Sequence, residues 1–501
     1  FVWALRHTHE RALRWVLQRR RLVQFVTLGT IVGTVALYIV TPKGFFPQQD
    51  TGMIAGQVET SQDTSFAEMT QKMRQIVDIV QHDPAIESVG SFIGSGGGSS
   101  SNTGRMFLTL KPPGERPKVE AVLERLRKQF TKVEGVGVFL QPIQDIRAGG
   151  RMTKSQYQYA LQDSDLTELT TWAPRLVAAL QKLPQLVDVS SDQQFQGLQT
   201  NVVVDRDAAG RLGIRPDVID STLYSAFGQR QVSVMYRSQN QYRVVLEADP
   251  EFQKDPRFLD KIYVRSGDGR MIPLSSIAHF EASNTPLSVG HQGQFACVTL
   301  SFDLAPGVSL EEATRLLDET RMSLHMPATV RGSFAGNAML FRESSSTQPL
   351  LILASLVAVY LVLGILYESL IHPLTILAAL PSAGMGALLA LQAFDLDLSI
   401  VALIGIILLI GIVKKNAILM VDFALAAQRE RGVFAEQAIY EACTVRFRPI
   451  LMTTVAAITG ALPLAIGMGV GSELRQPLGI AIVGGLIVSQ LLTLYITPIL
   501  Y

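Results

Sequence analysis

Two adjacent lysines, Lys414 and Lys415, lie near the middle of a long apolar run, residues 399–424. A lysine inside a membrane helix costs about 2.5–3.5 kcal/mol on insertion scales, so such a residue usually faces a polar interior and a partner. The alternative is that both lysines lie near a helix end and extend their ammonium groups to the membrane surface. A cation held inside a membrane can change its partner when a neighbouring carboxylate takes up a proton, which is the chemistry of a proton relay.

Three other polar residues lie within or beside the apolar runs. Thr453 follows Pro449 by just over one helical turn, and a threonine inside a helix more often bonds back to the preceding turn than serves a site. Arg446 lies just before the same run, where it is ordinary cytoplasmic charge on sequence alone. Asp422 follows Lys415 by seven residues, on nearly the same helix face but about 10 Å away, so we expect it at the membrane interface.

The histidines and cysteines form no pattern typical of an enzyme or a metal site. His7 and His9 are close in sequence but do not share a helix face, and the other five histidines are scattered. Cys297 and Cys443 are predicted to lie on opposite sides of a membrane, so they cannot pair. The net charge is +1, and no basic stripe with interleaved aromatic residues suggests nucleic acid. We therefore expect neither an enzyme nor a resident cofactor or metal.

The composition is 48% hydrophobic and 17% charged, and the apolar residues gather in segments long enough to cross a bilayer core of about 30 Å. Six segments reach that length: residues 22–40, 349–367, 374–394, 399–424, 449–470 and 477–501. The chain begins at Phe1 without a methionine and ends inside an apolar run, so we expect it to be part of a longer protein.

The positive charges predict the orientation of these segments. Arginines are frequent before the first segment and between the fourth and fifth, whereas the loop at 395–398 has no cation and the loop at 471–476 has only Arg475. Because short positive loops stay in the cytoplasm, both chain ends are expected inside and residues 41–348 outside. Residues 1–21 have the pattern of a basic amphipathic helix on the inner membrane surface.

The outer part, residues 41–348, repeats a pattern of a β-type run, an amphipathic helix and a second β-type run. The runs of the first two repeats are residues 53–58, 66–80, 86–92, 105–110, 118–130 and 136–140. Two such repeats predict a ferredoxin-like βαβ sandwich over residues 48–140. A second sandwich is predicted over 141–200 and 288–336, with residues 201–285 inserted into it. The predicted fold is a membrane bundle of six transmembrane helices plus a large α+β domain of βαβ sandwiches.

A glycine- and serine-rich stretch, residues 94–104, separates two of the predicted strands. It lacks the Gly-Lys-Ser/Thr ending of a phosphate-binding loop and precedes a strand, whereas such loops precede a helix. The stretch therefore predicts a flexible connection.

Four motifs are similar to those of resistance-nodulation-division transporters. They are Phe-Phe-Pro-Gln-Gln-Asp-Thr-Gly at 45–52, Leu-Tyr-Glu-Ser at 366–369 with His-Pro at 372–373, Lys-Asn-Ala-Ile-Leu at 415–419, and Arg-Phe-Arg-Pro-Ile-Leu-Met-Thr at 446–453. One span, a long exported domain and then five spans is the layout of the C-terminal half of such a pump. Residues 364–369 and 471–479 most resemble the heteromeric MdtB/MdtC type, in which two different pump chains share one trimer.

The resemblance implies half of a proton/drug antiporter in the bacterial inner membrane, driven by the proton motive force and exporting amphiphilic small-molecule drugs. Lys415, Asn416, Thr453 and Arg446 match the family's proton relay positions, with Lys415 pairing with carboxylates of the N-terminal half. The implied partners are that half, sister subunits in a trimer, a periplasmic adaptor protein, and an outer-membrane channel that meets the insertion at 201–285. Multidrug efflux of this kind confers antibiotic resistance.

The two sandwiches, by the same resemblance, flank a drug-entry cleft in a periplasmic porter domain. The substrate path is expected to include Phe92, Phe107, Gly96 and Gly97, because relatives place a mobile loop between two drug pockets at this point. Drug pumps of aromatic specificity have phenylalanines within that loop, and this sequence has them only beside it.

Two alternative functions remain open from the sequence. A heavy-metal exporter of the same superfamily would want Met or carboxylate ligands along its path, and the Met residues here are dispersed. A transport-inactive structural or regulatory subunit is the other alternative, because the subunits of a heteromeric pump need not all cycle protons.

Overall fold

The computed structural model describes residues 2–94, 100–146, 153–253, 255, 260–305 and 307–501, with side chains from residue 7 onward. The chain divides into two compact units, the first comprising Phe1–Gln193 with Val289–Tyr501 and the second comprising Gln194–Ser288. The first unit contains the membrane helices and two helix-covered sheets, and the second is inserted between two strands of the second sheet.

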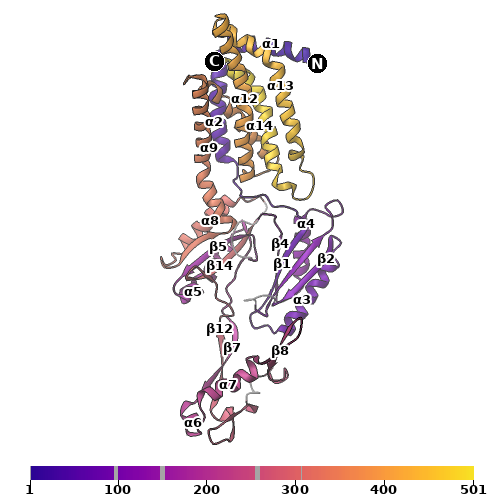
Figure 1. The fold of residues 1–501 in the computed structure, drawn as a ribbon, viewed down its shortest axis with the longest axis vertical. Helices are drawn as coiled ribbons and strands as arrows, with labels where there is room; N and C mark the ends of the chain where they lie inside the picture. Colours follow the sequence, from indigo (N-terminus) through magenta and orange to yellow (C-terminus); the bar gives the residue numbers. More distant parts are fainter. Residues whose placement is uncertain (1, 95–99, 147–152, 254, 256–259, 306) are drawn as a thin grey trace. The chain divides into compact units, whose positions relative to one another are not determined.

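Six helical segments among the described residues are long and apolar enough to cross a membrane, as predicted. They are α2 (Arg20–Val40), α9 (Asn337–Tyr367), α10 (His372–Leu377) with α11 (Leu380–Ala393), α12 (Ile400–Arg431), α13 (Ala435–Ile466) and α14 (Gln476–Leu500). The long helices run side by side in Figure 1. Helix α1 (Val2–Gln18) precedes them and buries Leu13 and Val16 on one face.

Helix α13 differs from the prediction at both ends. It starts at Ala435, well before the predicted residue 449, because Pro449 is accommodated inside the helix and Phe447 and Ile450 on either side of it are buried. Its end is set by Gly467, whose φ of 69° caps the helix in the left-handed conformation that glycine adopts without strain.

Helix α14 is the central member of the bundle, because it contacts α2, α11, α12 and α13. Small residues allow this close approach: a Cβ at Gly484 would lie 2.2 Å from the Ala390 side chain of α11, and one at Gly485 would lie 2.1 Å from Leu409 of α12. Tight packing through small residues is how membrane helices associate when the surrounding lipid removes the hydrophobic driving force.

The first outer sheet has the strand order β2-β3-β1-β4 with antiparallel neighbours, and its elements follow the predicted repeat. Side chains of β1 alternate between buried and partly buried positions, as expected for a sheet with one well-covered face. Buried residues of α3 recur every three or four positions at Met69, Met73, Ile76 and Val80, so this helix packs its apolar stripe on the sheet. The elements are β1 (Met53–Thr60), α3 (Phe66–Gln81), β2 (Ile86–Ile93), β3 (Thr103–Leu110), α4 (Val119–Phe130) and β4 (Val136–Pro142).

The second outer sheet repeats this arrangement with strands from distant parts of the chain. Strand β14 pairs with β5 and β6, and β5 also pairs with β15, all antiparallel. The chain therefore completes this sheet only after the inserted unit. The elements are β5 (Tyr157–Asp163), α5 (Leu166–Leu180), β6 (Leu186–Ser191), β13 (His291–Gln292), β14 (Phe295–Leu304), α8 (Leu310–Ser323) and β15 (Arg331–Ala335).

The inserted unit, Gln194–Ser288, has its own core, in which Ile214, Ile219, Val264 and Leu274 are buried. Strands β7 and β12 pair along their whole length, and a bridge between Gln194 and Ser288 closes the unit where the chain enters and leaves it. The elements are β7 (Gly197–Val204), α6 (Arg206–Arg211), α7 (Pro216–Phe227), β8 (Arg230–Tyr236), β9 (Gln241–Leu246), β10 (Tyr263–Arg265), β11 (Met271–Pro273) and β12 (Ala278–Thr285).

An ion-pair cluster joins the two outer sheets of the first unit. Arg127 of α4 lies 2.6 Å from the carboxylate of Asp188 and 4.0 Å from that of Asp303, which belong to the second sheet. Burial raises the pKa of Asp303 to about 6, and the nearby Asp188 charge adds to the rise, while the Gln156 N–H at 2.8 Å and Arg127 oppose it. The contact between the sheets therefore contains a carboxyl group that titrates well above the ordinary range of aspartate.

Removal of the inserted unit is expected to leave the rest of the chain folded. Replacing residues 195–287 with a two-residue Gly-Ser connection joins positions that already face each other across the Gln194–Ser288 bridge. The detergent-solubilised variant should insert into membranes and unfold within about 3 °C of the parent chain. As a control, deletion of α3 removes Met69 and Ile76 from a core and should abolish folding. Aggregation of the first variant would show that the inserted unit stabilises the remainder.

The second outer sheet is expected to lose stability as the pH rises through about 6. Because Asp303 has a folded-state pKa of about 6 and an unfolded value of about 3.9, the folded state binds the proton more tightly. Its stabilising contribution is complete below pH 3.9 and is lost as the pH rises through 6, by about 3 kcal/mol in total, of which roughly 1 kcal/mol is lost between pH 5 and pH 7. Trp172 fluorescence in a chain with Trp3 and Trp15 replaced by Phe measures this. Asp303→Asn should remove the difference between pH 5 and pH 7, and an unchanged difference would assign the titration to another group.

Candidate functional site

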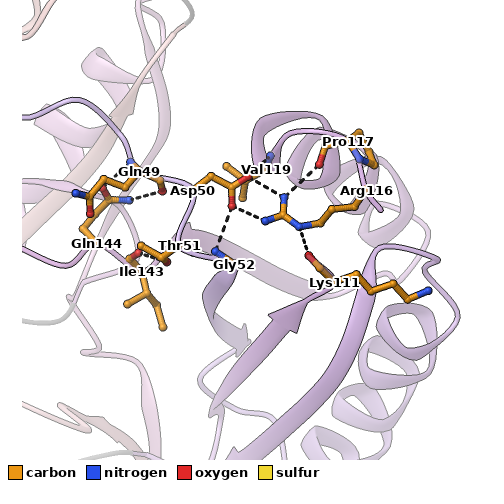
Figure 2. A network of polar contacts seen from close by, with 10 residues as sticks. All are labelled: Gln49, Asp50, Thr51, Gly52, Lys111, Arg116, Pro117, Val119, Ile143 and Gln144. Atoms are coloured by element: carbon orange, nitrogen blue, oxygen red, sulfur yellow. Dashed lines mark hydrogen bonds and ion pairs between the residues drawn. The ribbon is translucent and has the colours of Figure 1, made fainter. Parts of the chain in front are cut away.

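The motif at 45–52 places Asp50 where the chain leaves the membrane helix α2 and approaches β1. Arg116 binds this carboxylate with two hydrogen bonds, Nη1 to Oδ2 at 2.7 Å and Nη2 to Oδ1 at 2.6 Å (Figure 2). The backbone N–H groups of Gly52 and Val119 donate to the same carboxylate at 3.2 and 3.3 Å. Partial burial favours the neutral acid, but the hydrogen bonds and charge of Arg116 outweigh it and lower the pKa of Asp50. Asp50 is therefore held as a carboxylate.

The surroundings of this ion pair fix the chain on both sides of it. Arg116 is almost fully buried, with 1% of its side chain exposed, and its Nε donates to the Lys111 carbonyl at 2.6 Å. Next to Asp50, the Thr51 hydroxyl donates to the Ile143 carbonyl at 2.6 Å, beyond the end of β4 (Figure 2). The segment that follows α2 is thereby tied to the first sheet at several points, which positions that sheet relative to the membrane exit.

The two lysines of α12 lie at different depths in the bundle of this chain. Lys415 is exposed, Lys414 is partly exposed, and Asn416 is buried with 6% exposure. Neither lysine forms a hydrogen bond or ion pair within residues 2–501 as far as the structure describes them. Successive helix residues point about 100° apart, so the burial of Asn416 directs Lys415 to the outer surface of this bundle.

Asn416 lies in a network of polar side chains from three membrane helices. Its Nδ2 donates to the Thr454 hydroxyl of α13 at 3.1 Å and to Gln490 Oε1 of α14 at 3.3 Å. The Thr454 hydroxyl also donates to Gln490 Oε1 at 2.6 Å. Sequence reasoning identified Asn416 but missed Thr454 and Gln490. Amide and hydroxyl side chains inside apolar runs were the available signal, because such groups need partners in a membrane.

The other two predicted relay residues, Thr453 and Arg446, lie outside the Asn416 network. The Thr453 hydroxyl donates to the Ile450 carbonyl of its own helix at 3.1 Å, as a threonine inside a helix usually does. The Arg446 guanidinium lies over the Phe423 ring at 5.1 Å, and its buried Nε has no hydrogen-bond partner among the described residues. Asp422 is exposed. The structure thus brings Asn416 into contact with two unpredicted residues and does not join it to Thr453 or Arg446.

A pocket on the first sheet includes one of the predicted substrate-path residues. Phe107 lines it, and Lys154 lies over the Phe139 ring at 5.4 Å while pairing with Glu59. Phe92 is 53% exposed on the neighbouring strand and is not among the lining residues, whereas Gly96 and Gly97 lie outside the described residues. The pocket therefore combines aromatic faces with charged groups. It is lined by Ala55, Gly56, Gln57, Arg105, Phe107, Phe139, Gln141, Thr153 and Lys154.

The chain is similar to known proteins along almost its whole length. Multidrug resistance protein MdtC is 52% identical in Salmonella typhi and in Escherichia coli strain UTI89, and 53% identical in Cronobacter sakazakii. Each match covers 99% of this chain and 48% of the relative, so the chain spans about half the length of these proteins. The likeness to the MdtB/MdtC type is thus confirmed.

Solved structures give the same fold. Two crystal forms of a heavy metal efflux pump superpose with TM-scores of 0.88 and 0.87 at 24% and 25% identity, covering 100% of this chain and 52% of the pump. The profile of the AcrB/AcrD/AcrF family matches residues 1–501. The chain therefore belongs to the AcrB/AcrD/AcrF family of resistance-nodulation-division transporters.

Proposed function

We propose that this chain is the C-terminal half of an inner-membrane proton/drug antiporter that exports amphiphilic compounds through a tripartite efflux system. The observation that carries the proposal is Lys415, an exposed cation near the middle of α12 that has no partner within the described part of the chain. A charge at this depth needs a counter-charge. The chain spans about half of its relatives, so the N-terminal half is the natural source of the paired carboxylates.

The energy for export comes from protons in this proposal. A proton moving down the membrane potential supplies about 2.3 kcal/mol per 100 mV, which drives export only when protonation changes a contact between helices. Protonation of the partner carboxylates would release Lys415, and helix α12 would then move against its neighbours. Thr453 and Arg446 are assigned supporting roles in the same relay.

In this proposal, the exported compound passes through the outer domain. We assign both sheets to the ferredoxin-like type, because the strand order β2-β3-β1-β4 and its counterpart in the second sheet fit a split βαβ unit. The pocket containing Phe107 belongs to the substrate path. The inserted unit meets the outer-membrane channel, and the outer domains form the trimer contacts with sister subunits, alongside a periplasmic adaptor.

A transport-inactive subunit of a heteromeric pump is the second candidate, because the subunits of such a pump need not all cycle protons. In that case the sister subunit would perform the proton coupling and Lys415 would have no role in it. The two candidates differ in the outcome of a single substitution.

Lys415→Ala is expected to abolish drug export by the full-length pump while leaving its level and assembly normal, because the ammonium group has no hydrogen bond or ion pair to lose among the described residues. Resistance and proton-linked dye efflux are measured in cells that express equal amounts of protein. Lys414→Ala is the matched control and should retain most export, because this residue points about 100° away on the helix. Full export by the Lys415→Ala pump would establish the passive-subunit alternative.

Phe107→Ala is expected to weaken export of an aromatic amphiphilic dye by roughly two- to tenfold, because an aromatic contact contributes about 0.5–1.5 kcal/mol. The loss should appear as a higher apparent KM, with maximal export little changed. Phe66→Ala removes an exposed phenylalanine of α3 outside the pocket and serves as the control. Equal effects of the two substitutions would exclude the pocket from the substrate path.

A further inference from the structure

The network of Asn416, Thr454 and Gln490 connects three membrane helices at one point. Each residue comes from a different helix, and each lies near the middle of its helix. Asn416 and Thr454 are buried with 6% and 3% exposure, and all three hydrogen bonds join different helices. A mutual network of this kind fixes the relative rotation and height of the helices more sharply than apolar packing does.

One polar atom of the network has no partner. Gln490 Oε1 accepts from both Asn416 and Thr454, whereas the buried Gln490 Nε2 has no hydrogen-bond partner among the described residues. A buried amide donor without an acceptor is costly, particularly in a membrane, where no bulk water replaces it. An apolar residue would fill the same space without that cost. The amide is therefore poorly explained by packing alone.

The network fixes the position of Asn416, the residue that follows Lys415 in the chain. Because Asn416 is bonded toward α13 and α14, the rotation of α12 is fixed and Lys415 is held on the outer surface. Thr453, the adjacent hydroxyl, bonds within its own helix and has no such link. Thr454 and Gln490 are thus the side chains of α13 and α14 that bind the residue next to Lys415.

We propose that Thr454 and Gln490 are positioning residues for proton coupling at Lys415, acting through Asn416. The inference rests on the proposed function. When α12 moves, the Asn416 amide must leave or re-form its bonds to Thr454 and Gln490, and the free Gln490 donor offers an alternative bond during that exchange. The network thereby sets the equilibrium between two positions of α12.

The pH dependence of export can reflect any titratable group on α12 and on the helices that contact it. Helix α14 contains no charged residue, so the network itself contributes none. The variants of Thr454, Gln490 and Thr459 used below leave all titratable groups on α9, α10, α12, α13 and α14 unchanged. These groups are Arg342, Glu343, Tyr360, Tyr367, His372, Lys414, Lys415, Asp422, Arg429, Glu430, Arg431, Glu436, Tyr440, Glu441, Cys443, Arg446, Arg448 and Tyr495.

The test compares isosteric substitutions in the full-length pump. Thr454→Val and Gln490→Leu each remove two of the three network bonds, and Thr454→Ser keeps the hydroxyl. Thr459→Val is the matched control, because Thr459 lies on the same helix, is exposed, and bonds only to its own Val455 carbonyl at 2.8 Å. Export of a fluorescent dye is measured against external pH in cells with equal pump levels, and trimer formation is checked by size-exclusion chromatography.

The expected result is a roughly three- to tenfold loss of maximal export in Thr454→Val and Gln490→Leu. The pH of half-maximal export should also shift by about half a unit, which a residue with only a packing role would not cause. Thr454→Ser and Thr459→Val should match the parent pump. If Gln490→Leu fails to assemble, the comparison of Thr454→Val with Thr454→Ser decides the question alone.

Two results would overturn the inference. One is a normal pH profile in Thr454→Val, whether or not the amount of pump falls. The other is an equal effect of Thr459→Val. Lys415→Ala in the same assay distinguishes failure of the positioning role from failure of the proposed function. An inactive Lys415→Ala pump together with a normal Thr454→Val pump rejects only the positioning role. An active Lys415→Ala pump rejects the proposed coupling role of Lys415.

Discussion

The buried ion pair between Asp50 and Arg116 fixes how the membrane part of the chain continues into the outer domain. Its charges are mostly removed from water, which is costly, and four donated hydrogen bonds to the carboxylate compensate for that cost. Because Arg116 also binds the Lys111 carbonyl, a shift of the segment after α2 would break several bonds together. A movement of α2 is therefore transmitted to the first sheet as a rigid displacement, instead of being absorbed by a flexible connection.

In the membrane bundle, as at the Asp50–Arg116 ion pair, buried polar side chains bind one another. Helix α14 packs through glycines at its close contacts and carries Gln490 where it meets α12 and α13. The lipid-facing and helix-facing surfaces are both apolar, so hydrogen bonds between helices and the fit of small residues decide how the helices are placed. The polar network thus lies where a change in one helix is felt by two others. Its position next to Lys415 in sequence connects bundle geometry with the proton coupling proposed for that residue.

The two outer sheets are joined by contacts that can change. Arg127 pairs with Asp188 and lies near Asp303, a carboxyl group whose pKa is raised by burial to about 6. Lys154 pairs with Glu59 of the first sheet and lies beside the pocket that contains Phe107. These side chains are the links through which a displacement of the first sheet would alter the second. By comparison, the Asp50 carboxylate accepts four hydrogen bonds, and its ion pair with Arg116 is a rigid connection.

The sequence by itself determined the six apolar spans and most helices and strands of residues 41–348, because apolar length and period 3.6 or 2 are local properties. The interruption of the second sheet was visible as a break in the repeat, because strands β5 and β6 are separated in sequence from β14 and β15 by the inserted unit. Only the tertiary structure decided that Thr454, and not Thr453, joins Asn416, since both threonines occupy one apolar run and helix rotation chooses between them. Gln490 became part of the site for the same reason: it is 74 residues from Asn416 in sequence, and only packing of α14 against α12 brings the two amides together.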